Sequence, residues 1–260
     1  AAADGAVDLK LNAERALPDT PTVDIAFVLD TTGSMSEEIT ALKDTIVEVA
    51  DLLESEGMHV RLGLVEYRDR GDVFLTRMTQ MTTDVRGFAD RVAGLSANGG
   101  GDTPEDVNEG LRVAVEKLNW RDTFLSGDAS PKLSYQQATP YTDSVQRAAA
   151  QGIRIHTVAA SGMDDLGQVV WRQIAQYTGG ENMFVLRGGA GPQSTGAGDP
   201  TSSCGGTHEN YTSGNLAALI SGKVKRELVA LHADPLRIAG LDKDEKAKPC
   251  DQRVIVTAQR

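Results

Sequence analysis

The chain has 260 residues, of which 26 are basic and 37 acidic, so its formal charge is -11. This length suits one large domain with a full hydrophobic core and some additional elements. The acidic balance, without a Lys/Arg cluster, argues against nucleic acid and anionic membrane surfaces as partners. Because no apolar run approaches the roughly 20 residues that cross a bilayer, we expect no membrane span in this chain.

The N-terminal segment, residues 1–20, shows no sustained hydrophobic period and is predicted to be an extended arm. Its start, "AAADG", is what a signal peptide can leave after cleavage at an A-x-A type site, although an arbitrary chain boundary would look the same. We expect an extracytoplasmic protein, whether secreted, periplasmic or at the cell surface, from which the signal peptide has been removed.

The first core element is predicted at 23–30, "VDIAFVLD", a continuous apolar run typical of a strand that is buried on both faces of a parallel sheet. A helix is predicted next, because apolar residues recur at helical spacing from Ile39 to Leu53 and the pattern closes at Gly57. Two strands, 59–69 and 72–81, follow around a turn at "RDRGD", and a short helix is predicted at 84–95.

The second half of the chain continues this alternation. We predict a helix that opens at Pro104, strands at 120–128, 152–161 and 182–186, a helix at 165–180 and a final helix from Asn215 to His232. The helix at 165–180 is expected to bury an apolar face made of Leu166, Val169, Val170, Ile174 and Tyr177. The segment from Arg187 to Ser213 is rich in Gly, Ser and Thr and is predicted to be a long loop.

Strands that alternate with helices predict an α/β fold, with a doubly wound, mostly parallel sheet and helices on both faces. We assign this domain to residues 21–233. The tail, 234–260, is predicted to form a β-hairpin extension or the start of a further domain.

Small oxygen-bearing residues cluster where the predicted strands end. Asp30, Thr32 and Ser34 follow the first strand, Thr103 precedes a helix in "GGGDTPED", and Asp128 follows a later strand in "SGDASP". In an open α/β sheet the ligand site lies at the carboxyl ends of the strands. Since neither thiolate nor imidazole is present, the set suits a hard cation, Mg²⁺ or Mn²⁺, with Ca²⁺ as an alternative.

Each of these residues also has a purely structural interpretation. Ser34 with Glu37 matches a capping box, and Thr103 followed by Pro104 matches an N-cap with proline at the first helical position. Asp128 alone is typical of a turn. The joint pattern of the three segments favours the metal site.

In these motifs the chain resembles the von Willebrand factor type A (VWA) domain family over about residues 22–232. The metal-ion-dependent adhesion site of that family reads D-x-[ST]-x-S, then a threonine in a glycine-rich loop, then an aspartate after a central strand, and "DTTGS", "GGGDTPED" and "SGDAS" occur in that order. The resemblance implies that Thr32, Ser34 and Thr103 ligate the ion directly, whereas Asp30 and Asp128 act largely through water. The third segment departs from the family pattern, so Asp128 has a rival in Asp102.

The resemblance implies a metal-dependent protein-binding module, in which an aspartate or glutamate of a protein partner completes the coordination of the ion. The alternatives are an accessory or assembly factor of a larger complex, of the kind that partners AAA+ ATPases, and a metal-dependent hydrolase. The sequence has no nucleophile elbow, P-loop or H-E-x-x-H motif, so we expect no enzyme. His156 lies within an apolar strand and is expected to be a packed core residue.

Three further features lie outside this site. Cys204 and Cys250 both occur in polar, loop-like segments, and we predict a disulfide between them. Arg70-Gly71-Asp72 matches a tripeptide of integrin ligands, but Gly and Asp also suit a hairpin turn. Asn210 begins a glycosylation sequon whose use depends on the source of the protein.

Overall fold

The computed structural model describes residues 22–101, 104–118, 120, 122–136, 139–160, 163–185, 212–214 and 216–232. The chain divides into two units, Ala1–Gly222 and Lys223–Arg260, and the fold described below is that of the first. The predicted arm (1–20) and β-hairpin tail (234–260) lie outside the described residues, so the domain bounds of 21–233 stay a prediction.

The described strands form one seven-stranded sheet in the order β3-β2-β1-β4-β5-β6-β7. Their bounds are β1 Thr22–Asp30, β2 His59–Tyr67, β3 Thr76–Thr82, β4 Asp122–Gly127, β5 Arg154–Ala159, β6 Asn182–Val185 and β7 Thr212–Gly214. Only β3 runs antiparallel to its neighbour, and every other pairing is parallel. The predicted doubly wound, mostly parallel α/β sheet is therefore confirmed.

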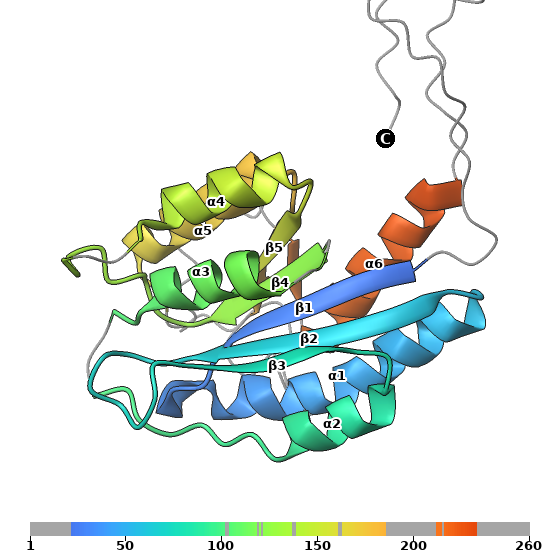
Figure 1. The fold of residues 1–260 in the computed structure, drawn as a ribbon, viewed down its shortest axis with the longest axis horizontal. Helices are drawn as coiled ribbons and strands as arrows, with labels where there is room; N and C mark the ends of the chain where they lie inside the picture. Colours follow the sequence, from blue (N-terminus) through green and yellow to red (C-terminus); the bar gives the residue numbers. More distant parts are fainter. Residues whose placement is uncertain are drawn as a thin grey trace, which may run out of the picture. The chain divides into compact units, whose positions relative to one another are not determined.

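The helices cover both faces of this sheet. They are a 3₁₀ turn η1 (Gly33–Met35), α1 (Ser36–Ser55), α2 (Val85–Ala93), α3 (Val107–Lys117), α4 (Tyr141–Ala150) and α5 (Asp165–Tyr177). A further helix, α6 (Leu216–His232), begins in the first unit and continues into the second. In Figure 1, α1 and α2 lie on one face, and α3, α4 and α5 lie on the other. None of the described helices combines the length and the hydropathy that a membrane crossing requires.

β1 lies at the point where the chain changes direction across the sheet, because β2 pairs with one of its edges and β4 with the other. The loops that leave its carboxyl end diverge there, which is where open α/β sheets bind ligands. The topology thus places the end of β1, at Asp30, at the expected position of a site.

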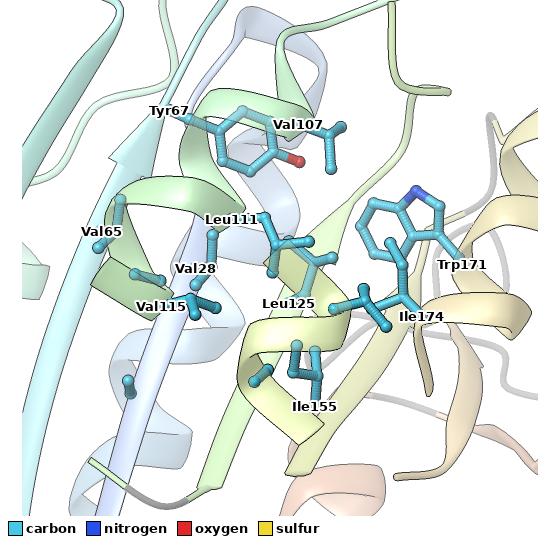
Figure 2. Packing of buried hydrophobic residues seen from close by; sticks show 14 of the residues in the cluster. Val28, Val65, Tyr67, Val107, Leu111, Val115, Leu125, Ile155, Trp171 and Ile174 are labelled. Carbon is cyan, nitrogen blue, oxygen red and sulfur yellow. The ribbon is translucent and has the colours of Figure 1, made fainter. Parts of the chain in front are cut away.

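The core packs on both faces of β1, which accounts for its continuous apolar sequence. On one face Phe27 lies 6.4 Å from Phe88 of α2 and stacks on Phe124 of β4 at 6.0 Å between ring centroids. On the other face Val28 belongs to the cluster drawn in Figure 2, which joins the sheet to α3 and α5. Figure 2 labels Val28, Val65, Tyr67, Val107, Leu111, Val115, Leu125, Ile155, Trp171 and Ile174 in this cluster.

The predicted secondary structure needs correction at four points. The helix expected to open at Pro104 begins at Val107, because the Asp106 side chain accepts a hydrogen bond from the Glu109 N–H and caps it. Helix α4 was not predicted, since few large apolar residues mark its buried face. The last residues of the predicted loop 187–213 enter a strand, because Thr212 and Ser213 pair with β6.

The fourth correction concerns α5. Its buried face contains Val170, Trp171 and Ile174, whereas Leu166, Val169 and Tyr177 are exposed. The apolar residues of α5 thus form one buried and one exposed stripe, and the predicted face combined residues of both. Only the Val170 and Ile174 part of that prediction is confirmed.

Candidate metal site at the carboxyl ends of the strands

Asp30 closes β1 and is completely buried. Its Oδ1 atom accepts hydrogen bonds from the Thr32 backbone N–H at 2.8 Å and from the Thr32 hydroxyl at 2.7 Å. Its Oδ2 atom has no hydrogen-bond partner among the described residues. The Oδ1 atom of Asp30 is therefore held by two hydrogen bonds, whereas its Oδ2 atom receives no hydrogen bond from the described residues.

Ser34 lies in η1, before the start of α1, and is exposed. Helix α1 begins at Ser36, and its N-cap residue, Met35, makes no side-chain cap hydrogen bond. The Ser34 Oγ atom lies 3.5 Å from Thr32 Oγ1, and its side chain also hydrogen-bonds with Asp128. The capping-box interpretation of Ser34 is wrong, and the structure brings Asp30, Thr32, Ser34 and Asp128 together.

The glycine-rich loop before α3 packs directly against the loop after β1. The Gly33 N–H donates to the Gly99 carbonyl at 3.2 Å, and the Asn98 N–H donates to the Thr31 carbonyl at 3.1 Å. A Cβ atom on Gly100, whose φ is 73°, would lie 2.8 Å from Thr32 Cβ. Glycine is required there because the two loops approach so closely.

Thr103 and its rival Asp102 lie outside the described residues, so the placement of the second predicted element stays a prediction. The residues on either side of them are described. Gly100 lies against Thr32, and a Cβ atom on Gly100 would also lie 3.2 Å from Glu105 Oε1. The described residues on the two sides of 102–103, Gly100 and Glu105, therefore lie close to each other.

Glu105 is a site residue that the sequence reasoning missed. It is only 3% exposed, and its Oε2 atom has no hydrogen-bond partner in the described part of the chain. Its backbone is held on both sides, because its N–H donates to the Ser130 carbonyl and its carbonyl accepts from the Lys132 N–H. A glutamate is common in the first turn of a helix, so nothing in the sequence singles out Glu105. The structure shows that the helix begins later, at Val107, and that Glu105 lies in the loop before it.

Burial, together with neighbouring charges at Asp30 and Glu105, raises the pKa of the carboxyl groups of this site. Burial raises the pKa of Asp30 from 3.8 to about 7, the hydrogen bonds from Thr32 oppose this shift, and the charge of Asp128 adds to it. Burial, followed by the charges of Asp30, Asp69, Asp72 and Asp128, raises the pKa of Glu105 to about 8. Burial also raises the pKa of Asp128, opposed by its hydrogen bond with Ser34. The site thus gathers carboxyl groups whose ionised forms are disfavoured in the metal-free protein, although the charge of Arg68 partly offsets this at Asp30.

Tyr67 ends β2 directly under this site and is completely buried. A Cβ atom on Gly127 would lie 2.5 Å from its hydroxyl oxygen and 3.3 Å from Asp30 Cβ. No partner for that hydroxyl exists among the residues that the structure describes. Its pKa is raised well above 10, first by burial and then by the charges of Asp30, Asp128 and Glu105, so it stays protonated.

These residues fit a divalent ion in chemistry. The donor atoms are carboxylate and hydroxyl oxygens, which Mg²⁺ and Ca²⁺ prefer. Two orphaned carboxylate oxygens, Asp30 Oδ2 and Glu105 Oε2, are the unsatisfied groups that a cation would neutralise. The described residues contain no group of three or more His, Cys, Asp or Glu side chains arranged to hold a metal by themselves. Any ion here would therefore depend on the hydroxyl groups as well.

Two other features that the sequence singled out have structural roles. Arg70 donates to Asp106 Oδ2 at 3.2 Å, and Asp72 accepts from the Gly100 N–H at 3.3 Å. The Arg-Gly-Asp turn is thus hydrogen-bonded to the N-cap of α3 and to the glycine-rich loop before it. His156 is buried, its ring lies 5.2 Å from that of Phe124, and its Nδ1 atom accepts from the Glu181 N–H. His156 is thus a packed core residue, as predicted. Cys204, Cys250 and Asn210 lie outside the described residues.

Comparison with known proteins gives one family. A family model described as von Willebrand factor A domain matches residues 24–186. The chain is 37% identical over 122 residues to von Willebrand factor A domain-containing protein 7 of Rattus norvegicus, a match that covers 45% of this chain and 13% of that protein. It is 31% identical over 111 residues to Alpha-protein kinase vwkA of Dictyostelium discoideum, covering 41% of this chain and 17% of that protein.

Solved structures include a similar fold, von Willebrand factor type A from Catenulispora acidiphila, with a TM-score of 0.46 and 16% sequence identity. That match covers 64% of this chain and 38% of the other. The chain spans less than a fifth of the length of the curated relatives named above.

Proposed function

Because this chain belongs to the von Willebrand factor A domain family, we propose that it is a protein-binding module whose binding depends on a divalent ion. Asp30, Thr32, Ser34, Thr103 and Asp128 would hold Mg²⁺ or Mn²⁺, with Ca²⁺ as an alternative. An aspartate or glutamate of a protein partner would complete the coordination. We also propose that the protein works outside the cytoplasm and that its partner is neither nucleic acid nor membrane.

The observation that supports this proposal is the pair of orphaned carboxylate oxygens, Asp30 Oδ2 and Glu105 Oε2. A buried polar group without a partner costs about 1–3 kcal/mol, and a charged one costs more. Burial raises the pKa of both groups, and the charge of Asp30 adds to the shift of Glu105, so their ionised forms destabilise the folded chain. A bound dication would remove that cost by pairing with both carboxylates.

We include Glu105 in the proposed site beside the five residues predicted from sequence. Its carboxylate lies near Thr32, because both approach the position of a Cβ atom on Gly100. The backbone hydrogen bonds on either side of it fix where that carboxylate lies. Glu105 would add a third negative charge to those of Asp30 and Asp128, which strengthens the attraction for a hard cation.

The proposed site faces solvent at Ser34, which is exposed, while Asp30 and Thr32 are buried behind it. A partner can therefore reach the ion from the Ser34 side. Hydroxyl ligands are neutral and leave the ion electropositive, so a carboxylate of the partner is the ligand that such an ion attracts.

We propose that this domain is not itself an enzyme. The hydroxyls of Thr32 and Ser34 interact with carboxylates of the site, and the buried His156 belongs to the core beside Phe124. No described histidine lies at the site to activate a nucleophile. The kinase activity in the name of the Dictyostelium relative belongs to a protein of which this chain covers 17%.

Calorimetric titration of Mg²⁺ and Mn²⁺ tests the proposal. We expect binding heat with the wild type, none with Asp30→Asn, and weaker binding with Glu105→Gln and Thr103→Ala. Asp84→Asn is the matched control, because Asp84 is an exposed helix cap on α2 whose side chain accepts from the Gly87 N–H. Equal heats in the wild type and Asp30→Asn, or no heat with the wild type, would overturn the proposal.

A further inference from the structure

We propose that Tyr135 is a positioning residue for the ion site, because its hydroxyl fastens the loop that contains Asp128 to the turn between β2 and β3. We call the hydrogen bonds between Tyr135 and Asp69 the Tyr135 latch. This inference rests on the function proposed above, and it concerns a segment, "PKLSYQQATP", that the predicted site does not use.

The Tyr135 latch is a short, bifurcated hydrogen bond from one hydroxyl to both oxygens of a carboxylate. The Tyr135 hydroxyl lies 2.5 Å from Asp69 Oδ1 and 2.7 Å from Asp69 Oδ2, and Asp69 is only 4% exposed. Burial and the hydrogen bond with Asp69 raise the pKa of Tyr135 to about 12, so the hydroxyl keeps its proton at physiological pH and donates it. A buried carboxylate that accepts from a phenol in this way holds the ring in one place.

Two cations hold the same ring. The Arg70 guanidinium lies 4.0 Å from the centroid of the Tyr135 ring and also pairs with Asp106, the cap of α3. The Lys132 ammonium lies 3.8 Å from Asp69 Oδ2 and 5.3 Å from the same centroid. The Tyr135 latch therefore joins the β2–β3 turn to the loop after β4, and Arg70 links that turn to the start of α3.

The loop after β4 reaches the ion site through its backbone. Asp128 belongs to that loop, and residues Ser130 and Lys132 hydrogen-bond with the Glu105 backbone on its two sides. A shift of the loop would therefore move two carboxylates of the proposed site, those of Asp128 and Glu105, at once. Because Tyr135 comes three residues after Lys132, its attachment to Asp69 limits that shift.

The test compares Tyr135→Phe with Tyr141→Phe. The first removes the latch but keeps the ring under Arg70. The second removes an exposed hydroxyl at the start of α4 that donates to Gln173 Oε1 of α5 at 2.6 Å. We expect Tyr135→Phe to weaken Mg²⁺ binding about 10-fold, by analogy with groups that orient metal ligands from behind. Tyr141→Phe should bind Mg²⁺ as the wild type does.

A double-mutant cycle separates positioning from a general loss of stability. Asp69→Ala removes the acceptor, and the double variant with Tyr135→Phe should bind Mg²⁺ no more weakly than Asp69→Ala alone, since each change breaks the same latch. In the metal-free protein, Tyr135→Phe should speed hydrogen exchange at the amides of Glu105 and Lys132, while Tyr141→Phe should not.

Additive losses in the cycle, or unchanged Mg²⁺ affinity and amide exchange in Tyr135→Phe, would overturn the inference and leave the proposed function intact. Absence of Mg²⁺ binding by the wild type would overturn both. The two failures are thus distinguished by the wild-type titration.

Discussion

At the scale of single residues, Asp30 is where burial and charge oppose each other most directly. It is fully buried at the end of β1, its Oδ1 atom is fixed by Thr32, and its Oδ2 atom has no partner in the described part of the chain. An aspartate in this position is favoured by a bound cation and disfavoured without one. The stability of the metal-free protein should report this conflict.

The pH dependence of that stability is the first prediction. The pKa of Asp30 is raised from 3.8 to about 7 and that of Glu105 from 4.5 to about 8, so the folded state favours their protonated forms. Their contribution to stability is therefore full at about pH 4 and is lost as the pH rises to about 8. In urea unfolding without metal, the urea concentration at the midpoint should decrease for the wild type as the pH is raised from 5 to 8. For Asp30→Asn this decrease should be smaller.

Excess Mg²⁺ should reduce this loss, because the ion binds the ionised carboxylates of the folded state. Parallel pH dependences in the wild type and Asp30→Asn would contradict the raised pKa of Asp30. Equal curves with and without Mg²⁺ would contradict an ion at this position.

The residue that the sequence could not reveal is Glu105. Asp30, Thr32, Ser34 and Asp128 were predicted from their positions at strand ends, and the structure brings them together. In the sequence, Glu105 is an ordinary residue for the first turn of a helix that opens at Pro104. Its role depends on the bridge to Pro131 and the contact near Gly100, which join segments far apart in the chain.

At the scale of elements, the start of α1 distinguishes two possible roles of Ser34, a helix cap or an ion ligand. Ser34 precedes α1 and makes no cap hydrogen bond, whereas Asp84 caps α2 by accepting from the Gly87 N–H at 2.9 Å. Ser34→Ala should therefore change the free energy of unfolding of the metal-free protein by less than about 0.5 kcal/mol, as a surface substitution does. It should weaken Mg²⁺ binding.

Asp84→Ala should show the opposite pattern, with about 1 kcal/mol lost on removal of a helix cap and unchanged ion binding. Chemical unfolding and calorimetric titration of the two variants check both halves. If Ser34→Ala lost stability as Asp84→Ala does and bound Mg²⁺ normally, Ser34 would be a cap after all.

Elements with strong periodicity were predicted well from sequence, and elements defined by tertiary contacts were not. The apolar run of β1 and the helical spacing of α1 indicate their structure directly. Helix α4 buries mainly Val145, Ala148 and Ser144, which give little periodic signal. β7 has only three residues and is defined by its pairing with β6, and no local sequence pattern predicts that pairing.

At the scale of the whole molecule, the predicted disulfide links two segments outside the described residues. Cys204 and Cys250 should be joined, and the cross-link would stabilise the chain by about 4 kcal/mol in the chain-entropy model. Mass spectrometry of non-reduced peptides should find the linked pair in protein from an oxidising compartment. Two free thiols there would contradict the disulfide and weaken the proposed extracytoplasmic location.

The whole account depends on one ion at the carboxyl end of β1, and anomalous diffraction from crystals grown with Mn²⁺ would locate it most directly. We predict a single strong peak at ligand distance from the Ser34 and Thr32 hydroxyls and beside Asp30, Glu105 and Asp128. The peak should be absent from crystals of Asp30→Asn. A Mn²⁺ peak elsewhere, or none at saturating Mn²⁺, would contradict the account.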